Sequence, residues 1–145
     1  MKRFAPALTF AALASGAFAH GGVTNPAVMA RMEAMSAIGA EVKALTRMAR
    51  GEVDFETSEV AARMQMIAAT AAQVPTLFEQ PESDPKSEAS PAIWVSYPEF
   101  TKRAVAMIEA AQAGAGAADE FELEEALGVL GETCKSCHQS FKIKL

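Results

Sequence analysis

Apolar residues recur at spacings of three, four and seven along four stretches of the chain, the period of an amphipathic helix. The first stretch runs from about Pro26 to Arg50, with Thr24 or Asn25 as a candidate cap and Gly51 at its end. Its apolar positions are Val28, Met35, Ile38, Val42, Leu45 and Ala49. This pattern predicts one long helix with a single buried face.

The second and third stretches have the same period. The second begins near Thr57 and is stopped or kinked by Pro75, whereas the third runs from about Pro98 to just before Gly114. Their apolar positions are Val60, Met64, Ile67, Ala71 and Val74, then Phe100, Ala104, Met107, Ile108 and Ala111. The connection 75–98 holds five of the seven prolines, which predicts an ordered loop or a short turn of helix there.

The fourth stretch runs from Asp119 to near the C-terminus. Its apolar stripe contains Leu123, Leu127, Leu130, Cys134, Cys137, His138 and Phe141. Four helices joined by two short connections and one long one are typical of an antiparallel up-down-up-down bundle. The sequence therefore predicts an all-α four-helix bundle.

The N-terminal residues have the layout of a secretory signal peptide. Lys2 and Arg3 precede a short apolar run, and small residues lead to Ala19 in an A-x-A arrangement. The alternative, a membrane anchor, is disfavoured because the run is too short to span a bilayer. We therefore expect cleavage after Ala19, a single domain over 20–145, and a periplasmic protein without a stable membrane insertion.

The charge balance restricts the class of partner. Removing Lys2 and Arg3 leaves 11 basic against 18 acidic residues, a net charge of −7. Because nucleic acids require a basic surface, they are excluded as partners. An acidic protein instead favours a partner protein with a basic docking face.

The two cysteines lie in the segment Cys134-Lys135-Ser136-Cys137-His138. A disulfide would close a very short loop, a redox-active pair is usually found near a βαβ pattern, and structural zinc needs four ligands. Cys-x-x-Cys-His is the attachment motif of c-type haem. On a helix these three side chains share a face, so both thiols can reach one porphyrin and the imidazole its iron. We expect one covalent haem c inside the bundle.

Candidates for the second axial ligand are His20, which lies outside the first helix, and one of the eight methionines. Met35 is favoured because it lies on the apolar stripe, with Gly39 one turn later leaving space for a flat haem. Arg31, one turn before Met35, is a candidate partner for a haem propionate. The alternative for Arg31 is a solvated surface arginine.

These residues resemble the cytochrome c′ family and its low-spin relatives. The resemblance rests on the C-terminal haem motif, on Arg31 with Met35, on Pro91-Ala92-Ile93-Trp94, and on Phe141-Lys142. It implies His138 as the proximal ligand, Cys134 and Cys137 as thioether donors, Arg31 beside a propionate and Trp94 in the haem environment.

The resemblance also implies two branches of function. In one, Met35 ligates a six-coordinate, low-spin iron and the protein is a one-electron carrier. In the other, the iron is five-coordinate and high-spin and binds NO or CO. No arrangement of catalytic groups predicts an enzyme. The resemblance makes a homodimer through the first two helices a further expectation.

Overall fold

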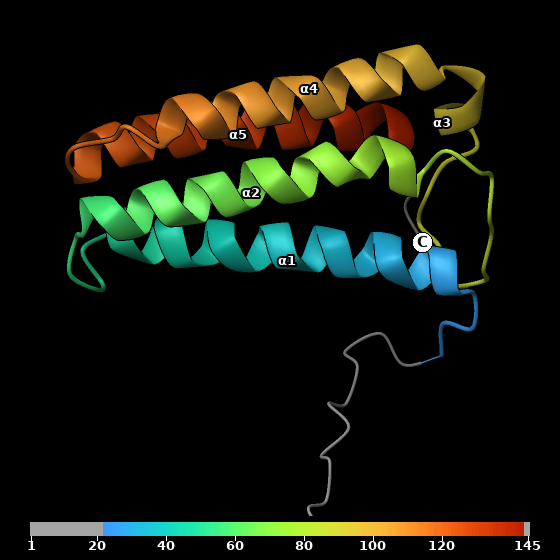
Figure 1. The fold of residues 1–145 in the computed structure, drawn as a ribbon, viewed down its shortest axis with the longest axis horizontal. Helices are drawn as coiled ribbons and strands as arrows, with labels where there is room; N and C mark the ends of the chain where they lie inside the picture. The colour runs from blue at the N-terminus through green and yellow to red at the C-terminus, as the bar shows by residue number, and fades with distance from the viewer. Residues whose placement is uncertain (1–21, 144–145) are drawn as a thin grey trace, which may run out of the picture.

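Five helices make up the regular structure of residues 22–143, the part of the chain that the computed structural model describes. The expected signal segment 1–19 and His20 lie outside it. The helices are α1 (Pro26–Ala49), α2 (Thr57–Leu77), α3 (Ala92–Val95), α4 (Tyr97–Gly114) and α5 (Glu120–Phe141). The four long helices alternate in direction, which confirms the predicted up-down-up-down bundle (Figure 1).

Side-chain caps fix where two of the long helices begin. The Asn25 side chain accepts hydrogen bonds from the backbone N–H groups of Ala27 and Val28, so it is the cap of α1. The Asp119 carboxylate accepts from the Glu122 N–H and caps α5. Both starts agree with the sequence pattern.

Two helix ends differ slightly from the prediction. α2 continues past Pro75 to Leu77, because a proline in the final turn removes only one intrahelical hydrogen bond. α4 includes Gly114 rather than ending before it. A Cβ atom at Gly114 would lie 2.9 Å from the Met64 Cε and 3.1 Å from the Ala126 Cβ, so the glycine permits close packing of three helices.

The core divides into two clusters along the bundle. The larger cluster lies toward the two short connections and includes Leu45, Met64, Ile67 and Leu123. The smaller cluster lies toward the long connection and is rich in aromatic residues: Val74, Phe78, Ile93, Phe100, Ala104 and Phe141. Within residues 22–143, no helix is long and apolar enough to cross a membrane.

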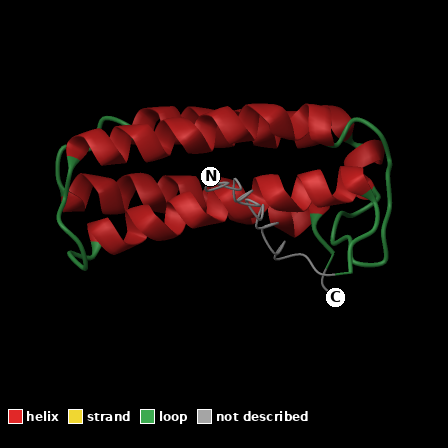
Figure 2. Cartoon of the chain, turned by 60° about the horizontal axis from the view of Figure 1, so that its bottom comes forward, coloured by secondary structure: helices red, strands yellow, loops and turns green. Residues whose placement is uncertain are grey.

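The long connection 78–91 crosses one end of the bundle and pairs with the end of α5 (Figure 2). The Ser90 N–H donates to the Phe141 carbonyl at 2.9 Å, and the Ile143 N–H donates to the Glu88 carbonyl at 2.8 Å. These bonds surround an isolated antiparallel bridge between Ala89 and Lys142. The connection is therefore held by backbone hydrogen bonds against this end of the bundle.

Asp84 attaches the same connection to the start of α1. Its Oδ2 accepts from the Thr24 N–H at 2.9 Å, the Thr24 hydroxyl at 3.1 Å and the Asn25 N–H at 3.1 Å, while Oδ1 accepts from the Lys86 N–H at 2.9 Å. These hydrogen bonds favour the ionised carboxylate, and they lower the pKa of Asp84 from 3.8 to about 2.

We expect Asp84→Asn to lower the thermal unfolding temperature at neutral pH. A pKa that is lowered by folding contributes stability above the unfolded value, and this contribution is lost as the pH falls from 3.8 toward about 2. The difference in unfolding temperature between wild type and variant should therefore narrow over that range. A difference that stays constant down to pH 2 would contradict this role of the carboxylate.

Candidate functional site

A cavity of about 430 Å³ lies inside the bundle near the long connection. It is lined by side chains of all four long helices and of the connection, and most of them are apolar. Its lining comprises Arg31, Met32, Met35, Ser36, Ile38, Gly39, Val42, Val74, Phe78, Glu88, Ala89, Ile93, Phe100, Arg103, Ala104, Met107, Thr133, Cys134, Cys137, His138, Phe141 and Lys142. A cavity of this kind suits a large, mostly apolar ligand held by a few polar groups.

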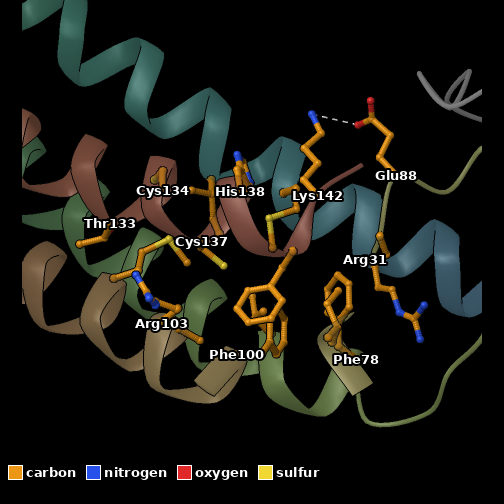
Figure 3. Close-up of a pocket in the computed structure, with 18 of the residues that line it drawn as sticks. Arg31, Phe78, Glu88, Phe100, Arg103, Thr133, Cys134, Cys137, His138 and Lys142 are labelled. Carbon is orange, nitrogen blue, oxygen red and sulfur yellow. Dashed lines mark ion pairs between the residues drawn. The ribbon is translucent and has the colours of Figure 1, made fainter. Parts of the chain in front are cut away.

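α5 brings the predicted motif to this cavity. Cys134, Cys137 and His138 all line it, the two thiols half-buried and the imidazole more exposed (Figure 3). The thiols do not form a disulfide. In residues 22–143, no group of three or more His, Cys, Asp or Glu side chains is placed to hold a metal ion, which argues against the zinc alternative.

Burial shifts the pKa values of all three side chains of the motif toward their neutral forms. Burial raises the pKa of the Cys134 and Cys137 thiols; a hydrogen bond with Thr133 offsets part of the first rise, and the Arg103 guanidinium offsets part of the second. Burial, followed by the charge of Lys142, lowers the pKa of His138. The imidazole is therefore held neutral, which is the form that binds a metal.

α1 provides the other predicted residues of the cavity. Met35 lines it and packs against the aromatic cluster. Gly39 also lines it, and a Cβ atom added there would have no neighbour within 4 Å, so the missing side chain leaves open space in the cavity. Met32, one turn before Met35, lines the cavity as well and provides a second thioether on the same helix.

Arg31 is a buried residue, so the alternative of a solvated surface arginine is wrong. Its side chain is 3 % exposed. Nε donates to the Leu77 carbonyl at 2.8 Å, Nη1 to that of Glu82 at 2.8 Å and Nη2 to that of Gln80 at 2.5 Å. The guanidinium thus points toward the long connection, away from His138 (Figure 3).

These three bonds change the expected role of Arg31. A guanidinium has five N–H donors, and three nitrogen atoms already donate to the loop. Its carbon also lies 4.8 Å from the centre of the Phe78 ring and 5.5 Å from that of Trp94. The contacts show that Arg31 binds the connection. Any contact of Arg31 with a haem propionate would come in addition to these hydrogen bonds.

Trp94 does not itself line the cavity but packs against the aromatic cluster that does, and its place in the haem environment stays a prediction. Its Nε1–H donates to the Phe78 carbonyl at 2.8 Å, and its ring lies against Arg31. The indole N–H of a half-buried tryptophan needs an acceptor, and the end of α2 provides one. Trp94 therefore acts on the cavity through Phe78, which does line it.

Three aromatic rings and two further cations complete the lining. Phe100 lies 5.1 Å from Phe78 and 5.4 Å from Phe141 between ring centres. Arg103 pairs with Glu99 at 2.8 Å, and Lys142 pairs with Glu88 at 3.0 Å. Arg103 was missed in the sequence, although it stands three residues after Phe100 and four before Met107 on the same helical face.

The chain was compared with known families and proteins. The model of the family described as Cytochrome C′ matches residues 26–142. A cytochrome c′ of Pararhodospirillum photometricum is 34 % identical over 116 residues, covering 77 % of this chain and 92 % of that one. A cytochrome c-556 of Agrobacterium fabrum is 30 % identical over 147 residues, covering 99 % of this chain and 97 % of that one.

Solved structures have the same architecture. Cytochrome c′ from Rhodopseudomonas palustris superposes with a TM-score of 0.76 at 27 % identity, covering 83 % of this chain and 98 % of that one. Oxidised cytochrome c556 of the same organism gives a TM-score of 0.76 at 25 % identity, covering 84 % and 99 %. The bundle is thus similar to proteins of both names.

We expect Arg31→Gln to lower the free energy of unfolding by roughly 3 kcal/mol or more, because it leaves buried carbonyls without their charged donor. Arg31→Lys should lose much of the same stability, since an ammonium cannot reproduce the planar fork. Urea unfolding of the purified protein measures both. The control is Arg47→Gln, which removes an exposed ion pair and should cost about 0.5 kcal/mol or less. Equal effects at positions 31 and 47 would refute the assignment.

Proposed function

The chain belongs to the cytochrome c′ family, and from this premise we propose that it is a periplasmic one-electron carrier with a low-spin haem ligated by His138 and Met35. Members of the family carry covalently bound haem c, and this chain has two cysteines for its attachment. The periplasmic location is supported by the export-type residues 1–19. The proposal makes the protein an electron carrier rather than an enzyme.

The cavity residues fit a haem in this role. Cys134, Cys137 and His138 all line the cavity. The two cysteines would form the thioether bonds, and the His138 imidazole would be the proximal ligand. When bound, haem supplies an iron that alternates between the ferric and ferrous states. The open space beside Gly39 and the mostly apolar lining would admit the flat macrocycle.

The observation that carries the proposal is that Met35 and His138 line one cavity from two different helices. A thioether from α1 and an imidazole from α5 are the ligand pair that gives c-type haems a raised reduction potential. A low-spin, six-coordinate iron changes little in geometry on reduction. The fixed helices on both sides of the cavity are consistent with such a rigid carrier.

The second candidate function is the binding of NO or CO by a five-coordinate iron. It is favoured by the packing of Met35 against the aromatic cluster, because a thioether can serve there as apolar packing alone. In that case the apolar cavity would leave space for a small gas beside the iron. The two candidates differ only in whether the Met35 sulfur binds iron.

Met35→Ala tests this difference in the purified haem protein. The wild type should show a sharp low-spin spectrum on reduction and no response to CO, whereas the variant should become high-spin, bind CO and have a lower midpoint potential. Met32→Ala is the matched control from the same helix and cavity, and exposed Met66→Ala is a second. A wild type that binds CO, or a variant with unchanged spin state and potential, would overturn ligation by Met35.

We further propose that the electron partner has a basic docking face, since the chain without residues 1–19 has a net charge of −7. The rate of electron exchange with a basic partner cytochrome should fall as ionic strength rises, because salt screens the attraction. Exchange with a neutral small-molecule reagent should stay constant and serves as the control. Equal salt dependence in both reactions would refute the docking proposal.

A further inference from the structure

Arg103 places a positive charge at the side of the cavity that carries the cysteines. It comes from α4 and lines the cavity together with Cys137 and Thr133. Figure 3 shows its side chain reaching toward these residues of α5. Its Nε donates to Glu99 Oε1 at 2.8 Å, one helical turn earlier, and the two side chains are 35 % and 45 % exposed.

The position of Arg103 is unusual for a charged residue. On the same face of α4, Phe100 is 4 % exposed and Ala104 is 3 % exposed. The other two cations of the lining already have roles in the fold. Arg31 binds loop carbonyls, and Lys142 pairs with Glu88 where the chain end meets the long connection. Arg103 differs from these two cations, because its ion-pair partner Glu99 lies on the same helix, α4. This ion pair therefore does not join two elements.

We propose that Arg103 and Glu99 form a charge pair that sets the reduction potential of the haem, Arg103 raising it and Glu99 lowering it. This inference rests on the proposed attachment of haem through Cys137. On reduction one electron arrives from the partner protein and the charge at the iron falls by one. A nearby cation stabilises the reduced state relative to the oxidised state, and an anion does the opposite.

The shared lining of the cavity supports an effect of this kind. Cys137 would be bonded to the edge of the porphyrin, so a charge that acts on its sulfur also acts on the macrocycle. Arg103 lines the cavity together with this cysteine, so its guanidinium would lie near the attached edge of the macrocycle. The pair is partly exposed, so solvent and salt reduce its influence without removing it.

The test is the midpoint potential of the haem-loaded protein, measured by spectroelectrochemical titration. Arg103→Gln should shift the potential downward, and Glu99→Gln should shift it upward, because it leaves the cation uncompensated. The double variant should lie between the two, and added salt should shrink each single shift. Opposite shifts would distinguish a charge effect from loosened packing, which has no reason to reverse sign between two neighbouring residues.

The control pair is Arg47 and Glu52, which form an ion pair at 3.4 Å and do not line the cavity. Arg47→Gln and Glu52→Gln should each move the potential much less than the substitutions in α4. Shifts of the same sign for Arg103→Gln and Glu99→Gln, or shifts no larger than those of the controls, would overturn the inference. Opposite shifts in a protein that binds CO would support it while overturning the proposed carrier function.

Discussion

The buried guanidinium of Arg31 is the constraint on which this end of the bundle depends. A buried charge is tolerated only if its donors find acceptors, and here the acceptors are carbonyls of residues 77, 80 and 82. The chain after α2 must therefore turn inward over α1. This turn places Phe78 in the cavity and carries the connection across the bundle to the end of α5. Burial lowers the pKa of Arg31, and the negative charge of Glu82 offsets part of this effect.

The features that the sequence predicted correctly depend on neighbouring residues within one helix. Cys134, Cys137 and His138 share a face because of their spacing alone, and the structure places all three in one cavity. The caps at Asn25 and Asp119 are local in the same sense. These features predict the starts of two helices and the face of α5 that lines the cavity.

The features that the sequence did not predict depend on contacts between segments that are distant along the chain. Arg31 binds residues 46 to 51 positions away, and no periodicity shows which carbonyls will meet it. The hydrogen bond from the Trp94 indole N–H to the Phe78 carbonyl, 16 residues earlier, is a second contact of this kind. Arg103 had a visible signal in its helical spacing. A charged residue is normally expected to face solvent, so this spacing was not taken as a sign of a cavity residue. Its ion pair with Glu99, on the same helix, allows the charge to stay near the core.

The position of the distal side chain follows from these same contacts. Met35 lies one turn after Arg31 on α1, and the start of that helix is bound to the connection through Asp84. α5 is bound to the connection by backbone hydrogen bonds at Phe141 and Ile143. The helix of the proposed distal ligand and the helix of the proposed proximal ligand are thus fixed to one segment. The connection therefore helps to hold α1 and α5, and with them Met35 and His138, at their positions in the cavity lining.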